Sequence, residues 1–247
     1  LKEFEDVWFK EELAVNHPFK KMIVRIRNEI VSLHKDVDMT KKGKYVSPKE
    51  FLEAIEDKDS IILDARNYYE YKMGRFKNAI NPEIKTFREF PEFVDKFKNK
   101  VDKNKKIFMY CTGGIRCEKA SVYMEEQGFE NVYQLHGGII NFCQELPNTA
   151  WKGKCFVFDK RLMSDIDQNN EPITVCANCG ETCDLQRNCK NVSCDEFIVQ
   201  CVKCQEKLHG CCSIQCMKEF LKYARERARK KKDGSWVAPD MIQDYRV

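Results

Sequence analysis

The sequence lacks any long run of apolar residues. It also shows no leader pattern, no large net charge and no motif of a redox cofactor, and each absence argues against a class of protein. No segment approaches the roughly 18 apolar residues that a membrane-spanning helix needs, so we expect a soluble protein with no membrane partner. No basic-then-apolar leader opens the chain, which favours a cytoplasmic location. The net charge of +4 is too small to indicate a partner by itself.

The sequence also shows no motif that would bind a redox cofactor. No Gly-x-Gly-x-x-Gly fingerprint joins a predicted strand to a helix, so we find no flavin or nicotinamide site. The four histidines are scattered, which argues against an iron site built from two histidines and one carboxylate. Cysteine, in contrast, is abundant, with fourteen residues. In a reducing cytoplasm, spaced cysteine pairs indicate metal binding or catalysis before disulfides.

The length predicts one full domain with smaller flanking pieces. Residues 1–44 are interpreted as a remnant or linker, in which alternating apolar residues at 22, 24 and 26 predict a half-buried strand; the alternative is an extension that packs on the main domain. Residues 45–148 alternate strands and helices, which predicts an α/β fold with a mostly parallel sheet and helices on both faces. Residues 149–247 form a small cysteine-rich C-terminal module with a basic tail.

Several local patterns place the elements of the central domain. Ser47 predicts the cap of a helix, because a proline follows it directly and a glutamate stands three residues after it. The apolar residues that follow predict an apolar face on this helix. Residues 60–63 and 131–135 are typical of short strands. In parallel sheets the chemistry lies at the carboxyl ends of the strands. Asp64 and Cys111 both follow such ends.

The most informative stretch runs from Ile107 to Cys117. The apolar run 107–110 predicts a buried strand, the glycines after Cys111 predict a tight turn, and residues 118–128 have helical spacing. Backbone N–H groups in such a loop and the dipole of the following helix stabilise an anion and lower the pKa of a thiol. We therefore expect Cys111 to be a reactive thiolate, assisted by the cation of Arg116.

Two other interpretations of this stretch stay open. The first is a glycine turn in an α/β domain with an incidental buried cysteine. The second is a cysteine phosphatase, which also holds an anion between a cysteine and an arginine. Four residues separate Cys111 from Arg116, whereas the phosphatase signature has five, and Tyr110 stands where that signature usually has histidine. The tighter ring fits one sulfur atom better than a phosphate.

The string CTGGIR at 111–116 resembles the active-site loop of the rhodanese family, with Cys111 matching its persulfide-forming nucleophile. The segments 61–66 and 74–80, Glu70 between them, and Leu135-His-Gly-Gly-Ile139 resemble other elements of that family, so the likeness covers about residues 45–148. The longer string CTGGIRCEKAS, with TFREFPEF before it and a cysteine-rich tail after it, is similar to the bacterial tRNA uridine hydroxylase family.

This second resemblance implies a substrate and a reaction. It implies tRNA as partner and an oxygen-dependent hydroxylation of the wobble uridine at C5, with molecular oxygen as co-substrate. It also implies a further small α/β domain on the N-terminal side of residues 1–44. We assign Cys111 and Arg116 as catalytic. Candidate substrate-binding residues are Asp64, Arg66, Arg88, Thr112, Gly113, Gly114 and Ile115.

Several of these assignments have a structural alternative. Asp64 and Arg66 either orient the active-site loop and hold substrate, or form a strand-end cap and a structural ion pair. Glu70 is either functional or a solvated capping group. Cys117 either resolves an oxidised Cys111 or is a packed small side chain. The phenylalanines near Arg88 either stack on bases or belong to the core, so Arg88 is the better substrate candidate.

Ten cysteines fall between residues 176 and 216. Two Cys-x-x-Cys pairs about twenty residues apart predict a structural zinc site, with Cys176, Cys179, Cys201 and Cys204 as ligands. The remaining six cysteines suffice for a second site, with or without His209; disulfides are the alternative. The following segment 217–232 predicts a helix with eight basic and two acidic residues, either an RNA-backbone contact or a solvated face.

Three functions therefore remain in view. The first is a hydroxylase in which Cys111 adds to C6 of the uracil and activates C5 towards oxygen. The second is a rhodanese-type sulfurtransferase that carries sulfur as a Cys111 persulfide. The third is a zinc-stabilised RNA-binding adaptor, which tolerates loss of Cys111 but not of the basic tail.

Overall fold

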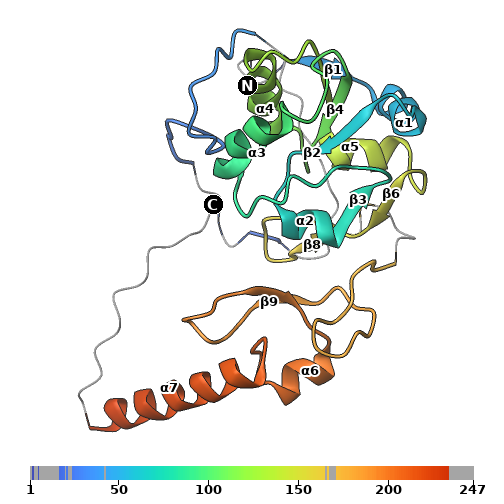
Figure 1. Cartoon of the computed structure of the whole chain (residues 1–247). Coiled ribbons are helices and arrows are strands. Elements are labelled where there is room, and N and C mark those ends of the chain that lie inside the picture. Colours follow the sequence, from blue (N-terminus) through green and yellow to red (C-terminus); the bar gives the residue numbers. More distant parts are fainter. Residues whose placement is uncertain are drawn as a thin grey trace. The chain divides into compact units, whose positions relative to one another are not determined.

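A computed structural model describes residues 24–41, 43–164 and 171–233, together with residues 2, 5, 17–19, 21 and 166. The chain forms two compact units, Leu1–Ile173 and Thr174–Val247, which are described separately (Figure 1). None of the helices in the described part of the chain combines the length and hydropathy needed to cross a bilayer.

The first unit is built on a four-stranded sheet with the order β1-β5-β4-β2, in which every pairing is parallel. This confirms the predicted α/β class. The elements of the unit are β1 (Lys44–Val46), α1 (Pro48–Glu56), β2 (Ile61–Asp64), α2 (Tyr68–Met73), β3 (Gly74–Phe76), the 3₁₀ helix η2 (Phe87–Glu89), α3 (Phe90–Phe97), β4 (Lys106–Tyr110), α4 (Ile115–Glu126), β5 (Asn131–Leu135), α5 (Gly138–Glu145), β6 (Trp151–Gly153), β7 (Cys155–Phe156) and β8 (Met163–Ser164).

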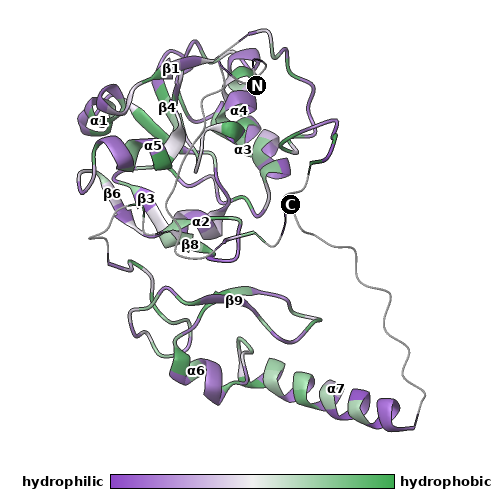
Figure 2. Ribbon diagram, turned by 180° about the vertical axis from the view of Figure 1, so that it is seen from behind, coloured by the Kyte–Doolittle hydropathy of each residue, from purple (hydrophilic) through white to green (hydrophobic). Residues whose placement is uncertain are grey.

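The side chains of β4 alternate between two hydrophobic cores, one on each face of the sheet. Ile107 and Met109 join a core that includes buried residues of α3 and α4. Phe108 and Tyr110 join the opposite core, with buried residues of α1 and α5. Figures 1 and 2 show this arrangement, with hydrophobic strands between the helices. The prediction of helices on both faces is confirmed, and the period of two follows from strand geometry.

Local signals placed several elements correctly. Ser47 and Glu50 form the expected capping box at the start of α1, in which the N–H of Ser47 donates to Glu50 Oε2 over 2.7 Å. The strand predicted at 131–135 is β5. The first unit also extends past residue 148, because β6 pairs antiparallel with β3.

The half-buried strand predicted near residues 22–26 is wrong where it can be checked. Residues 22 and 23 lie outside the described residues, while Val24 and Ile26 are exposed and belong to no strand. Leu33, further along, is wholly buried in the core beside α4, and the Lys119 ammonium donates to the Glu29 carboxylate over 2.8 Å. The part of this segment around Glu29 and Leu33 therefore packs on the main domain.

The second unit is small and has two short strands, β9 (Gln186–Asn188) and β10 (Phe197–Val199), paired antiparallel. Two helices follow, α6 (Val202–Lys207) and α7 (Ile214–Lys232). The predicted tail helix starts earlier than residue 217 because Ser213 caps it: its hydroxyl accepts a hydrogen bond from the N–H of Cys216 over 3.1 Å. No residue of α7 is buried, and its C-terminal end is strongly hydrophilic (Figure 2).

Candidate active site

Cys111 lies in the sharp loop between β4 and α4, at the carboxyl edge of the parallel sheet. Gly114 adopts a left-handed backbone conformation with a φ of 92°, and α4 begins directly after it at Ile115. The backbone N–H of Gly114 donates a hydrogen bond to Cys111 Sγ over 3.1 Å. The sequence predicted a helical segment at 118–128 with Cys117 in its first turn, and α4 begins at Ile115 because the left-handed glycine turns the chain directly into the helix.

The Cys111 thiol is acidic although the residue is wholly buried. Burial raises its pKa, but the Cys117 thiol, the charge of Arg116 and the N–H groups of these two residues outweigh it and lower the pKa to about 5. Burial and the neighbouring Cys111 raise the pKa of Cys117 well above its usual range, so Cys117 stays protonated and donates. Cys111 is therefore a thiolate at neutral pH, stabilised by a ring of hydrogen-bond donors.

Arg116 forms a buried ion pair with Glu70 on α2. Its Nη1 lies 2.6 Å from Glu70 Oε2, and its Nη2 lies 2.8 Å from Glu70 Oε1. Glu70 is wholly buried and also accepts a hydrogen bond from the N–H of Asn67 over 3.1 Å. Burial opposes the charge of Arg116, but Glu70 and the Cys111 thiolate raise its pKa above the usual value. The cation is thus held in one orientation beside Cys111.

The Gly137-Gly138 turn at the start of α5 packs directly against the cysteine loop. The N–H of Ile139 donates to the carbonyl of Cys111 over 3.0 Å. A Cβ on Gly138, which has a φ of 68°, would lie 2.5 Å from that carbonyl oxygen. Only a glycine fits this close backbone approach. The Gly-Gly-Ile string noted in the sequence is therefore a wall of the site.

Asp64 and Arg66 form a second ion pair, and both residues are wholly buried. Arg66 Nε lies 2.9 Å from Asp64 Oδ1, and Arg66 Nη2 lies 2.7 Å from Asp64 Oδ2. The same Nη2 donates to the carbonyl of Gly74 over 2.7 Å, at the start of β3. The guanidinium lies 5.2 Å from the centre of the Trp151 ring. This geometry favours the structural ion pair over direct contact with a substrate.

The other candidate residues differ in their accessibility. Thr112 and Gly113 are half-buried, Gly114 is buried, and Ile115 is 47% exposed at the start of α4. Arg88 is exposed on η2 and forms no hydrogen bond or ion pair with the described residues. Ile115 and Thr112 therefore lie on the loop where a substrate could reach them, whereas Arg88 lies on η2, outside that loop.

Three residues that complete the site were underrated from the sequence. Glu70 was weighed as a solvated capping group; it does cap α2, but its carboxylate also holds Arg116. Cys117 was favoured as a packed side chain and is the donor to Cys111. Gly138 had no assigned role beyond the family resemblance. Only the short spacing between Cys111 and Cys117 could have indicated a site role from the sequence. Glu70 and Gly138 lie far from the loop in the chain, so no local pattern points to them.

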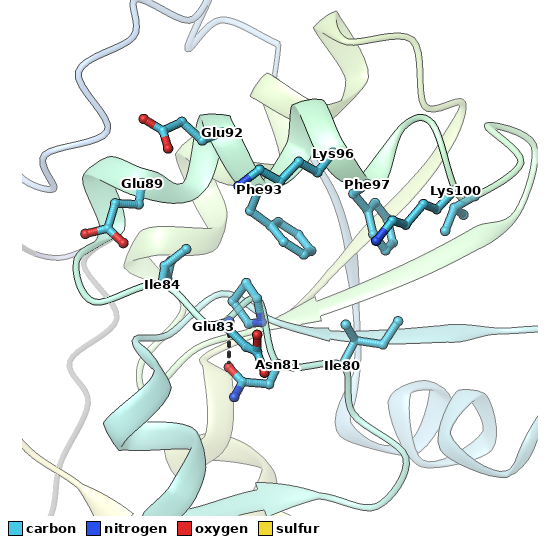
Figure 3. A pocket seen from close by; sticks show the side chains of 12 residues that line it. Ile80, Asn81, Glu83, Ile84, Glu89, Glu92, Phe93, Lys96, Phe97 and Lys100 are labelled. Carbon is cyan, nitrogen blue, oxygen red and sulfur yellow. Dashed lines mark hydrogen bonds between the residues drawn. The ribbon is translucent and has the colours of Figure 1, made fainter.

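A separate pocket of about 560 Å³ lies between α3 and the connection from β3 (Figure 3). Phe93, Lys96 and Phe97 line it from α3, opposite Ile80 and Glu83. None of the residues 111–116 lines it. The phenylalanines of this segment serve mainly as core and pocket wall.

The cysteine-rich unit brings its thiols into two groups. Cys176, Cys179, Cys201 and Cys204, the predicted ligands, place their sulfurs within 4.8 Å of one another. Cys179 Sγ and Cys201 Sγ are 3.6 Å apart, and all fourteen cysteines are free thiols. Four sulfurs around one tetrahedral zinc lie about 3.8 Å apart, given Zn–S bonds of about 2.3 Å. This group could hold a metal ion. None of the cysteines forms a disulfide, which was the alternative.

Comparison with known proteins places these features in a family. Residues 47–145 match the family described as Rhodanese-like domain, and residues 152–217 match the family described as Rhodanase C-terminal. A protein of Chlamydia caviae named tRNA uridine(34) hydroxylase is 43% identical over 86% of this chain and 66% of its own length. A protein of the same name from Cytophaga hutchinsonii is 45% identical over 86% of this chain and 69% of its own.

A third relative of that name, from Chlamydia trachomatis serovar D, is 39% identical over 98% of this chain and 76% of its own length. The chain thus spans about two thirds to three quarters of these relatives. The Rhodanese-like match includes the cysteine loop, and the C-terminal match includes both groups of thiols, the second of which consists of Cys189, Cys194, Cys212 and Cys216. The chain belongs to the tRNA uridine(34) hydroxylase family, a group of proteins with a rhodanese-like α/β domain.

Proposed function

We propose that the protein hydroxylates uridine 34 of tRNA at C5, with molecular oxygen as co-substrate and Cys111 as the reactive group. The observation that carries the proposal is the Cys111 thiolate, which Cys117, Arg116 and backbone N–H groups keep ionised at neutral pH. The names of the relatives supply the substrate and the reaction. Because those relatives extend beyond the matched residues, the activity is proposed for the full-length protein.

The proposed chemistry uses Cys111 as a covalent catalyst. Its thiolate adds to C6 of the uracil, and the electron pair moves to the enolate that makes C5 nucleophilic. C5 then bonds to oxygen as a peroxide, and two thiols of an external reductant become a disulfide while the outer oxygen leaves as water. Loss of the C5 proton and of the Cys111 thiolate from C6 yields 5-hydroxyuridine. Arg116 remains paired with Glu70 and stabilises the thiolate at both ends of this cycle.

The burial of Cys111 sets a condition on this route. The residue has no exposed surface, so a uracil ring reaches its sulfur only when the side chains or backbone that cover it move aside. Mixing the full-length protein with tRNA that carries 5-fluorouridine at position 34 tests the route. Fluorine cannot leave C5 as a cation in place of the proton, so it blocks the elimination that would release Cys111 from C6. A protein–RNA adduct that Cys111→Ser abolishes supports addition to C6. Hydroxylation by Cys111→Ser without any adduct contradicts it.

The basic helix α7 supplies the proposed contact with the tRNA backbone. Its last turn carries Arg229, Lys230, Lys231 and Lys232, all exposed. Each phosphate contact contributes about one unit to the salt dependence of binding. Replacing Lys230 and Lys231 by glutamine should weaken tRNA binding and flatten its salt dependence, whereas Lys49→Gln with Lys58→Gln, in the first unit, should not. Equal effects of the two pairs would remove α7 from the interface.

Zinc at Cys176, Cys179, Cys201 and Cys204 is proposed as structural. Four free thiols with converging sulfurs suit this ion, and the second unit has few buried apolar residues to hold it together. When bound, zinc would cross-link the two Cys-x-x-Cys pairs. The free state of all the cysteines also supports the proposed cytoplasmic location.

The decisive experiment is nucleoside mass spectrometry of tRNA from cells that lack the protein. Cells complemented with the full-length wild type should regain 5-hydroxyuridine derivatives, and cells with Cys111→Ala should not. If both forms restore the modification, Cys111 is a scaffold residue. If neither restores it and a thiolated nucleoside responds instead, the function is sulfur transfer.

Sulfur transfer is the second candidate because the Cys111 cradle also suits a persulfide. The ring of N–H donors and the nearby guanidinium stabilise any sulfur anion at this position. A sulfurtransferase should gain the mass of one sulfur atom on Cys111 when incubated with thiosulfate and release sulfite. An RNA-binding adaptor, in contrast, should retain its cellular function in Cys111→Ala.

A further inference from the structure

The second group of thiols in the cysteine-rich unit comes from positions that show no Cys-x-x-Cys spacing. Its members are Cys189, Cys194, Cys212 and Cys216, and their sulfurs all lie within 4.8 Å of one another. Cys194 Sγ lies 3.7 Å from Cys212 Sγ, which lies 3.4 Å from Cys216 Sγ. The two other thiols of this region, Cys183 and Cys211, belong to neither group.

These distances fit metal coordination and not disulfide bonding. A disulfide joins its sulfurs at about 2.05 Å, whereas sulfurs that share a tetrahedral zinc lie about 3.8 Å apart. The group also has an outer hydrogen bond of the kind that orients thiolate ligands, since the N–H of Cys212 points at Cys189 Sγ over 3.4 Å. Four converging thiolates without a cation would repel one another.

The group joins two parts of the unit that are distant in sequence. Cys189 directly follows β9, and Cys194 lies in the connection between β9 and β10. Cys212 stands just before the cap of α7, and Cys216 lies in the first turn of that helix. A polar contact lies beside this junction, where Asn191 Nδ2 donates to Glu219 Oε2 over 2.7 Å.

Helix α7 has little else to hold it. None of its residues is buried, and its basic side chains are exposed along most of its length. Hydrophobic packing, the usual anchor of a helix in a protein, is limited in the described part of α7 to half-buried residues, Met217, Phe220, Leu221 and Ala224. A metal ion at its first turn would add to that packing.

We propose that Cys189, Cys194, Cys212 and Cys216 bind a zinc ion that fixes the start of α7 to the β9–β10 hairpin. The ion is distinct from the one assigned to the two Cys-x-x-Cys pairs, so the chain holds two zinc ions. The second ion makes α7 a rigid extension of the cysteine-rich unit. This inference concerns metal content and rigidity and stands whether or not the protein hydroxylates tRNA.

Metal analysis of the full chain tests the stoichiometry. Purified wild type should contain two zinc ions per chain, and Cys194→Ala should contain one. Cys183→Ala, which removes a thiol outside both groups, should retain two. Cys194→His should also retain two, because imidazole replaces the thiolate as a ligand. A wild type with one zinc, or a Cys194→Ala variant that keeps two, overturns the proposal.

Cobalt substitution keeps the test valid if Cys194→Ala does not fold. The thiolate-to-cobalt charge-transfer absorbance of the wild-type chain should grow until two equivalents are bound. Saturation at one equivalent overturns the second site. Amide hydrogen exchange of the zinc-loaded chain should be slow in the first turns of α7 and become fast in Cys194→Ala, while exchange in α4 stays the same in both. Unchanged exchange in α7 would contradict the anchoring role.

Discussion

Arg116 and Glu70 meet through two parallel hydrogen bonds, with N–O distances of 2.6 and 2.8 Å, although their positions in the chain differ by 46. Glu70 is wholly buried and Arg116 nearly so. The bidentate geometry fixes the guanidinium in one plane beside the cysteine loop. The cation that stabilises the Cys111 thiolate is therefore itself held by a carboxylate from α2.

Neutralising Glu70 should destabilise the fold. In Glu70→Gln the buried Arg116 loses its counter-charge, and breaking a buried pair typically costs about 3–5 kcal/mol of unfolding free energy. Urea denaturation followed by circular dichroism measures this loss. Glu56→Gln, which removes an exposed partner of Lys77, is the control and should leave the unfolding curve unchanged. A loss as small as the control's would mean that Arg116 does not depend on Glu70.

Cys111 should titrate as an acid far below an ordinary thiol. The difference in ultraviolet thiolate absorbance between wild type and Cys111→Ser should rise with pH around a midpoint of about 5. Because the unfolded thiol binds its proton up to a higher pH, ionisation of Cys111 stabilises the fold. This contribution grows from about pH 5 upward and is lost as the pH falls through that value. A midpoint near that of a free thiol would refute the thiolate assignment.

Removing the Cys117 donor should raise the pKa of Cys111. A hydrogen bond to a charged group contributes about 1.5–3 kcal/mol, so Cys117→Ala should shift the midpoint upward by about one to two pH units. Cys117→Ser retains a donor and should shift the midpoint much less. The same absorbance titration compares the two variants. Equal midpoints in wild type and Cys117→Ala would leave Cys117 as a packing residue only.

An alanine at position 138 should distort the cysteine loop. Its Cβ would come within 2.5 Å of the Cys111 carbonyl oxygen and within 2.7 Å of the Gly114 nitrogen, both backbone atoms that cannot move cheaply. Left-handed strain of about 1–3 kcal/mol adds to this clash.

Gly128→Ala provides the matched control for position 138. Its φ of 92° is also left-handed, but its new Cβ meets only the flexible end of the Lys103 side chain. Gly138→Ala should therefore lose more stability than Gly128→Ala and should also raise the Cys111 midpoint. Similar unfolding curves and Cys111 titrations for the two variants would show that the α5 turn does not support the loop.

Local sequence signals determined the parts of the site that depend on neighbouring residues. The strand ending at Tyr110, the glycine turn and the helix that follows were all predicted, because alternation, glycine conformation and helical spacing act over a few residues. The capping box at Ser47 and the first group of cysteines that could hold a metal ion were found for the same reason. The half-buried strand near residue 24 failed because alternation alone does not supply a partner strand.

Tertiary structure alone decided which distant groups meet around these local features. The sequence placed Cys111 in a loop before a helix, but only the sheet brings Glu70 to Arg116 and the α5 turn to the Cys111 carbonyl. Likewise, the irregular spacing of these four cysteines, Cys189, Cys194, Cys212 and Cys216, gave no sign that their sulfurs lie together. They meet only because the β9–β10 hairpin packs beside the start of α7. Backbone preferences are encoded locally, whereas pairings across a sheet or between a hairpin and a helix follow from the packing of the whole unit.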